Sequence, residues 1–146
     1  MYINCSNDFA QNSEKVRRKC IKKIAAILST ISDNNRCEVS DFSDSPFFKN
    51  VTYNISLFDY LIRLEKYYDC SDSIIIVMLI YIDRLDVSAK IFINKYSAHR
   101  IVIAAYNLAN KYMEDEHYSN EYYAKVAGIP VDELNMLEIE ILKKLN

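Results

Sequence analysis

Hydrophobic residues recur along this chain with the three- and four-residue spacing of amphipathic α-helices. The first such segment runs from Ser13, a candidate N-cap, to about Ile31. Its apolar stripe consists of Val16, Cys20, Ile24, Ile27 or Leu28, and Ile31. The polar run Ser32–Asn35 then ends the pattern. We therefore predict a first helix that packs on the core through this stripe.

Five further segments have helical spacing: 55–68, 72–87, 97–113, 120–127 and 131–145. Ser71 is a candidate cap for the segment 72–87. That segment is apolar on nearly every side, so we expect it at the centre of the core. Three small residues in the next segment, Ala104, Ala105 and Ala109, allow close approach of neighbouring helices. The pattern predicts a bundle of six helices.

Each remaining segment has a recognisable start, end or stripe. The apolar stripe of 55–68 consists of Leu57, Leu61, Leu64 and Tyr68. The stripe of 131–145 consists of Leu134, Leu137 or Glu138, Ile141, Leu142 and Leu145. Gly128 stands where a helix end requires a positive φ, and Pro130 suits the opening of the last helix. The irregular stretch 41–54 reads as a linker within one domain, pinned to the core by Phe47 and Phe48.

Composition supports an all-α fold and excludes several functional classes. The 146 residues include one Gly and two Pro, too few for the turns of a β-sandwich or barrel. The net charge of −2 offers no general attraction to nucleic acid. The longest apolar run, 74–82, is about half of the roughly 20 residues that span a bilayer. We expect no membrane or small-molecule partner.

Candidate catalytic and metal-binding residues do not form recognisable sets. The cysteines stand singly at 5, 20, 37 and 70, which favours a reduced intracellular compartment over a disulfide framework or zinc site. His99 and His117 are not accompanied by the other residues of a metal-binding motif. A single glycine in the chain excludes a glycine-rich nucleotide-binding loop. We expect no metal, cofactor or catalytic residue. The basic segment 15–23 is either a solvated helix face or a nuclear-localisation or nucleic-acid patch.

Four motifs in order and register resemble the cyclin box. They are Leu57-Phe58-Asp59-Tyr60-Leu61, Tyr81-Ile82-Asp83-Arg84-Leu85, Ala104-Ala105 with Ala109-Asn110-Lys111-Tyr112-Met113-Glu114-Asp115, and Glu133-Leu134-Asn135-Met136-Leu137-Glu138. Three shorter pieces are similar to the P/U-type, or phosphate-regulon-like, branch of cyclins. They are His99-Arg100, the run from Tyr118 to Lys125, and Gly128-Ile129. Together the pieces cover roughly 90 residues.

The resemblance implies a fold and a function. The fold would be all-α, with a single five-helix cyclin box at 55–146 after an N-terminal helix and linker at 1–54. The chain would be a regulatory subunit, not an enzyme. It would activate a cyclin-dependent serine/threonine protein kinase in the nucleus, the cytoplasm or both, by packing on the kinase αC helix. Lys111 and Glu138 match the family's paired residues that hold the αC backbone. Leu108, Tyr112 and Leu142 would be apolar contacts around them.

The chain departs from the family pattern at three places. The family's aspartate at Asp83 pairs with an arginine, whereas the matching position here is Asn54, so that ion pair should be absent. We interpret Asp59, Asp83 and Arg84 as structural. The stretch Tyr53–Leu57 matches poorly the patch that binds RxL peptides in many cell-cycle cyclins. No residues remain after the first box for the second repeat of larger members.

Two other functions stay open beside a kinase activator. A cyclin-like scaffold would dock a kinase without activating it. A transcription-factor-type module would bind protein or nucleic acid through the same fold, although the charge balance makes nucleic acid an unfavourable partner. The sequence leaves open the kinase, its substrates and the process, whether cell cycle, nutrient signalling or transcription.

Overall fold

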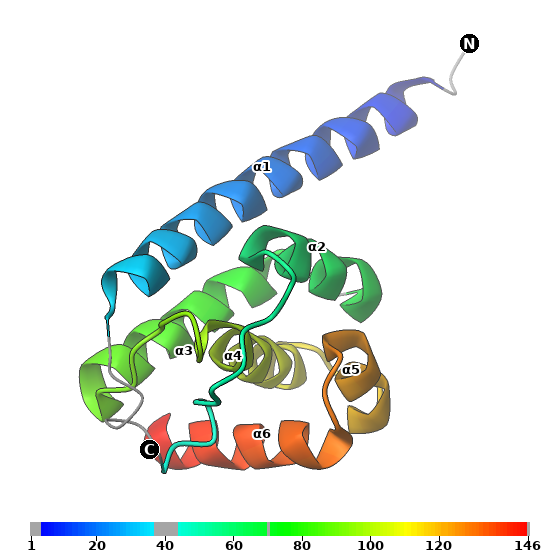
Figure 1. Cartoon of the computed structure of the whole chain (residues 1–146). Coiled ribbons are helices and arrows are strands. Elements are labelled where there is room, and N and C mark those ends of the chain that lie inside the picture. The colour runs from blue at the N-terminus through cyan, green and yellow to red at the C-terminus, as the bar shows by residue number, and fades with distance from the viewer. Residues whose placement is uncertain (1–3, 37–43, 70, 146) are drawn as a thin grey trace.

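The computed structural model describes residues 4–36, 44–69 and 71–145, and within them the chain is helical without a strand. The predicted all-α fold is confirmed. The helices are α1 (Asn4–Asn34), α2 (Leu57–Tyr68), α3 (Ser73–Ala89), α4 (Ala98–Met113), α5 (Asn120–Ala127) and α6 (Val131–Leu145). Figure 1 shows α2 to α6 gathered into one body, with α1 lying across it.

Local capping chemistry explains several of the helix ends. The Ser56 hydroxyl accepts a hydrogen bond from the backbone N–H of Asp59, and Ser119 caps α5 in the same way. Gly128 has φ +73°, its N–H bonds the Lys125 carbonyl, and the N–H of Ile129 bonds the Ala124 carbonyl. The predicted bounds of α5 and α6 are therefore confirmed. The predicted cap at Ser71 is wrong, because α3 starts after Asp72 without a side-chain cap bond.

The helix at the centre of the body is α4, and the prediction that 72–87 would be central is wrong. Most α4 residues are buried, and Ala104, Ala105 and Ala109 are completely enclosed. The outer face of α3 is exposed at Ile76, Ile80 and Val87. An apolar helix thus lies at the edge of the core, because α4 and α6 cover only one of its sides.

The first helix is longer than predicted and packs through a different face. It begins at Asn4, so Ser13 is not its N-cap. Its buried apolar residues are Ile21, Ala25 and Leu28. The predicted stripe is exposed at Val16 (55%) and Ile27 (60%), whereas Leu28, the alternative to Ile27, is buried and Ile24 is partly buried. Neighbouring stripes of a helix lie about one residue apart around its axis. Contact with α2 buries the stripe that contains Ile21, Ala25 and Leu28.

The linker before α2 contacts the helices through Phe47 and through Lys49, which joins a charged cluster between α4 and α6. Phe47 is completely buried, as predicted, whereas Phe48 is partly buried. Lys49 Nζ lies 2.6 Å from Glu133 Oε2 in the first turn of α6. The other oxygen of Glu133 lies 2.7 Å from Arg100 Nε in α4. This charged cluster holds the first turns of α4 and α6 together.

Candidate functional site

The structure brings together the two charged residues that the sequence singled out. Lys111 lies in the last turn of α4 and Glu138 lies in the middle of α6. Lys111 Nζ is 2.9 Å from Glu138 Oε1 and 3.0 Å from Oε2. The two side chains retain 27% and 11% of their exposure. A partly buried ion pair of this geometry is less screened by water and salt than an ordinary surface pair.

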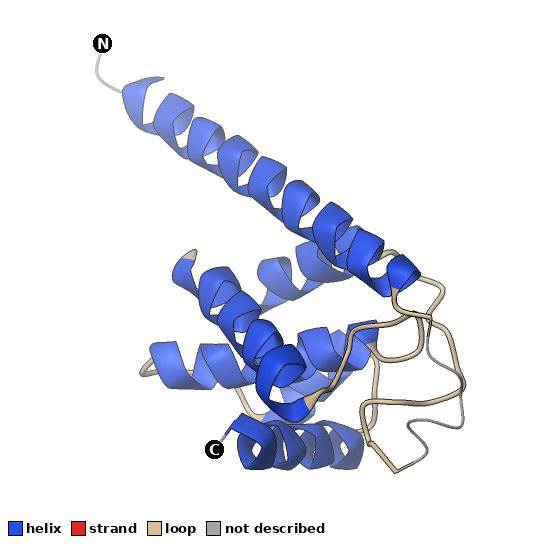
Figure 2. Cartoon of the chain, turned by 90° about the vertical axis from the view of Figure 1, so that its left-hand side faces the viewer, coloured by secondary structure: helices blue, strands red, loops and turns tan. Residues whose placement is uncertain are grey.

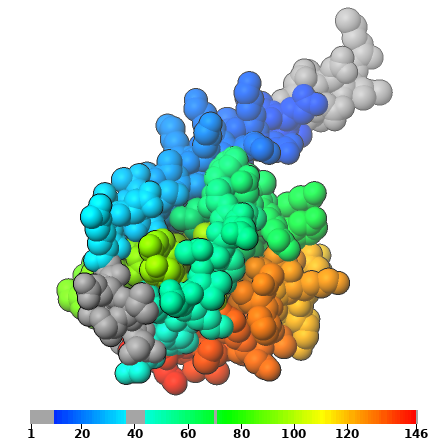
Figure 3. Space-filling view, in the orientation of Figure 1, coloured from blue at the N-terminus to red at the C-terminus, as the bar shows by residue number. Residues whose placement is uncertain are grey.

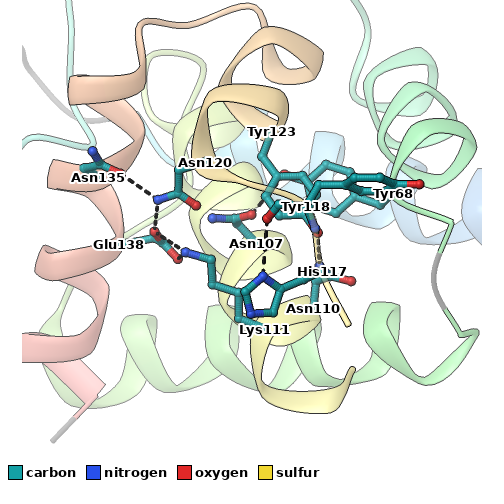
Figure 4. A network of polar contacts seen from close by, with 10 residues as sticks. All are labelled: Tyr68, Asn107, Asn110, Lys111, His117, Tyr118, Asn120, Tyr123, Asn135 and Glu138. Atoms are coloured by element: carbon teal, nitrogen blue, oxygen red, sulfur yellow. Dashed lines mark hydrogen bonds and ion pairs between the residues drawn. The ribbon is translucent and has the colours of Figure 1, made fainter. Parts of the chain in front are cut away.

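A residue that the sequence analysis missed also holds the Glu138 carboxylate. Asn120, the first residue of α5, donates from Nδ2 to Glu138 Oε2 at 2.7 Å and to Asn135 Oδ1 at 2.6 Å. Figure 4 shows Glu138 between Lys111 and Asn120, which approach it from different helices. The contact depends on how α5 packs on α6, so neither periodicity nor a motif indicated it.

A buried aromatic network supports the helices that carry the site. Asn110, next to Lys111, donates to the Tyr123 hydroxyl at 2.7 Å. The Tyr68 hydroxyl donates to Asn107 Oδ1 at 3.2 Å, and the rings of Tyr68 and Tyr123 stack with centroids 4.2 Å apart. Burial raises the pKa of Tyr68 well above its ordinary value, so its hydroxyl stays protonated and donates. These contacts join α2, α4 and α5 (Figure 4).

Exposed apolar side chains stand beside the ion pair on both helices. Tyr112, which follows Lys111, keeps 75% of its exposure, and Leu142 keeps 51%. Leu142, which also belongs to the apolar stripe of α6, is thus not part of the core, whereas Leu108 is partly buried. Met136 and Ile139 extend the exposed face and border a hollow of about 390 Å³ on α6. Sequence analysis missed these two, although their three-residue spacing with Leu142 places all three on one stripe.

The three residues interpreted as structural are not part of this site. The carboxylate of Asp59 accepts a hydrogen bond of 2.7 Å from the Ser56 hydroxyl at the start of α2. Asp83 and Arg84 are exposed on α3. Within the described residues, no ion pair or hydrogen bond joins Asp83 to Asn54 or Arg84.

Two other kinds of site are not found in the described part of the chain. Its His, Cys, Asp and Glu side chains form no group of three or more that could hold a metal ion. None of its helices combines the length and apolar character needed to cross a membrane.

Comparison with known proteins identifies the family. The profile of the cyclin family matches residues 7–146, which include most of α1 as well as the five following helices. The chain belongs to the cyclin family. The predicted resemblance is confirmed. In this cyclin, Lys111 and Glu138 are in direct contact across α4 and α6.

Individual relatives agree with the predicted branch. The cyclin is 35% identical over 140 residues to Cyclin-U4-3 of Arabidopsis thaliana, covering 94% of this chain. It is 37% identical over 114 residues to the PHO85 cyclin-like protein psl1 of Schizosaccharomyces pombe. It is 33% identical over 129 residues to the PHO85 cyclin PHO80 of Saccharomyces cerevisiae. The matches to psl1 and PHO80 cover 77% and 86% of this chain. The chain spans 63% of the length of Cyclin-U4-3 and 44% of the length of each of the other two relatives.

Proposed function

We propose that this cyclin is a regulatory subunit that binds and activates a cyclin-dependent serine/threonine protein kinase, with no catalytic activity of its own. Residues 55–146 would form the cyclin box, and residues 1–54 the N-terminal helix and linker. The observation that carries the proposal is the Lys111–Glu138 ion pair, held by Asn120 and flanked by exposed apolar side chains. The names of PHO80 and psl1 as PHO85 cyclins support a kinase as the class of partner.

The ion pair has hydrogen-bonding capacity left for a partner. An ammonium group has three N–H donors and an ionised carboxylate has about four lone-pair positions. Glu138 accepts from Lys111 at both oxygens and from Asn120 at Oε2, which leaves about one acceptor position on the carboxylate. Charge-assisted bonds from these groups to the backbone ends of a kinase helix are strong where an interface excludes water. Because three helices hold the pair, little side-chain freedom is lost on binding.

The apolar neighbours would supply the contact area. Tyr112, Ile139 and Leu142 are large and exposed, and an aromatic or aliphatic side chain is typical of the centre of a protein interface. A kinase αC helix packed here would be held in its active orientation. Activation is then a population shift, because the cyclin binds the active arrangement of the kinase more tightly than the inactive one.

The first test compares two double substitutions. Lys111→Ala/Glu138→Ala should weaken kinase binding at least about tenfold, because it removes a partly buried, hydrogen-bonded charge pair from the interface. The matched control is Arg17→Ala/Glu65→Ala, which removes an interhelical pair of similar exposure, 3.0 Å apart, between α1 and α2. The kinase would be recovered by affinity capture with the wild-type chain and identified by mass spectrometry. Binding constants would be measured by calorimetry.

Three results would count against the proposal. A folded Lys111→Ala/Glu138→Ala variant that binds the kinase as tightly as the wild type excludes this surface. A kinase assay with and without the chain separates activation from docking, and unchanged activity would make the protein a scaffold. DNA binding that disappears after neutralisation of residues 15–23 would instead favour the transcription-factor-type function.

A further inference from the structure

A second surface of this cyclin, between α2 and α5, concentrates positive charge. The two helices lie side by side on the right of the molecule in Figure 3, with α2 in green above α5 in orange. Arg63 and Lys66 of α2 and Lys125 of α5 line one open groove of about 520 Å³. Among the described residues, no carboxylate lines this groove, although the chain as a whole has a net charge of −2. The groove is therefore positively charged on a chain whose net charge is negative.

The carboxylates nearest in sequence do not neutralise these cations. Asp59 and Glu121 stand four residues before Arg63 and Lys125, the best spacing for an ion pair on a helix. Asp59 instead accepts from the Ser56 hydroxyl at 2.7 Å. No ion pair joins Glu121 to Lys125 among the described residues, and the backbone and the Ser119 side chain at the start of α5 lower the pKa of Glu121.

The third acidic candidate is also engaged elsewhere. Glu65, beside Lys66 in sequence, pairs with Arg17 of α1 at 3.0 Å. In the described part of the chain, the three cations of the groove form no ion pair with any carboxylate. Three like charges along one groove repel each other, so an anionic ligand would relieve an unfavourable arrangement.

The tyrosines of the groove give it a fixed shape. The Tyr122 hydroxyl of α5 donates to the Tyr67 carbonyl at the end of α2, at 2.8 Å. The ring of Tyr122 packs on that of Tyr118 with centroids 4.4 Å apart. Lys66 Nζ lies 5.3 Å from the centroid of the Tyr67 ring. The walls are thus joined before any ligand arrives, and preorganisation lowers the entropic cost of binding.

We propose that the α2–α5 groove binds a phosphorylated segment of a partner protein. A phosphoserine or phosphothreonine carries a charge of nearly −2 and three acceptor oxygens, which matches a group of cations better than a single carboxylate does. Arg63 would bind the phosphate bidentately, and Lys66 and Lys125 would contribute point charges. The volume of the groove is typical of small-ligand sites, and Ile62 and Tyr67 offer apolar contact to the residues beside the phosphate.

The groove is separate from the proposed kinase surface. None of its lining residues belongs to α4 or α6, which carry Lys111 and Glu138. A phosphorylated protein and a kinase could therefore bind the same cyclin together. The proposal does not depend on kinase binding, and it is tested on the cyclin alone.

The test is an NMR titration of the isotope-labelled chain with a heptapeptide that has a central phosphoserine between leucines. We expect saturable shifts in the amides of 62–67 and 122–126. A peptide with glutamate in place of phosphoserine should bind about tenfold more weakly, and the serine peptide should produce no saturable shift. Arg63→Glu/Lys66→Glu should abolish the binding. Lys22→Glu/Lys23→Glu, the same charge change on exposed residues of α1, should leave it intact.

Three outcomes would overturn the proposal. The first is the absence of saturable shifts in the wild-type chain. The second is equal loss of binding in both charge-reversal variants, which indicates general electrostatic attraction. The third is equal affinity for the glutamate and phosphoserine peptides, which indicates a site without phosphate selectivity. The spectrum of each variant shows directly whether it is folded, so a folding defect cannot be mistaken for a lost site.

Discussion

At the scale of single residues, Glu133 combines burial with two ionic partners. Its oxygens lie 2.7 Å from Arg100 Nε and 2.6 Å from Lys49 Nζ. Arg100 and Glu133 are both buried, whereas Lys49 is exposed. The net contribution of such a cluster to stability is small, because desolvation opposes the attraction. Removing one member is costly, because it leaves the opposite charge buried and uncompensated.

We predict that Glu133→Gln lowers the free energy of unfolding by about 3 kcal/mol, measured by urea denaturation. The matched control is Glu140→Gln, which breaks a surface pair with Lys144 at 3.7 Å. The control should lose less than about 0.5 kcal/mol. Similar losses in the two variants would mean that the buried cluster contributes no more than a surface pair.

The same substitution has a pH signature. Burial raises the pKa of Glu133, but hydrogen bonds from Lys49 and Arg100 and their charges outweigh burial and lower it below the ordinary value of 4.5. A carboxyl with a lowered pKa stabilises the folded state fully above its unfolded pKa. This stabilisation is lost as the pH falls through the folded value. The free energy of unfolding should therefore fall less steeply below about pH 4.5 in Glu133→Gln than in the wild type.

At the scale of elements, three helices end on a residue with positive φ. The residues are Asp69 after α2, Lys90 after α3 and Gly128 after α5, with φ of 48°, 56° and 73°. Glycine has no Cβ, so it adopts this conformation without the steric cost that other residues incur. The end of α3 is therefore strained at Lys90, although the N–H of the next residue, Ile91, bonds the Leu85 carbonyl at 3.1 Å.

We predict opposite effects of glycine at two of these ends. Lys90→Gly should raise the free energy of unfolding by about 0.5 kcal/mol, because relief of strain exceeds the added freedom of the unfolded chain. Gly128→Ala should lower it by about 1 kcal/mol. No atom lies within 4 Å of the added Cβ, so the loss at Gly128 is due to the backbone alone. Thermal unfolding measures both, and a shift of the same sign in the two variants would contradict the argument.

At the scale of the whole molecule, α1 is the element least integrated into the body. Figures 1 and 2 show its N-terminal half extending past the other helices. Residues 10–16 are all exposed, whereas Ile21, Ala25 and Leu28 are buried. By contrast, α4 is enclosed by α2, α3 and α6. Local stability should follow this difference in burial.

Hydrogen–deuterium exchange should show a gradient of protection. We predict the slowest exchange in 101–110 of α4, faster exchange in 21–28, and the fastest in 10–16. Mass spectrometry of peptic peptides from the isolated chain makes this measurement. Protection of 10–16 equal to that of α4 would show that a second copy or another part of the protein covers this half of α1 in solution.

The sequence alone determined the features that depend on neighbouring residues in the chain. The bounds of α5 and α6 followed from Gly128 and Pro130, because caps and breakers act within one turn. The spacing of the cyclin motifs indicated the family and selected Lys111 and Glu138. These two residues were identified without any knowledge of their distance.

Only the tertiary structure decided which surfaces meet. Helical periodicity offers several adjacent stripes, and packing on α2 chose the stripe of Ile21 and Leu28 over that of Val16 and Ile27. Packing likewise enclosed α4 and left Leu142 exposed. The bond from Asn120 to Glu138 joins α5 to α6 across 18 positions of sequence. Contacts of this range arise when the helices pack together, so no local pattern of residues encodes them.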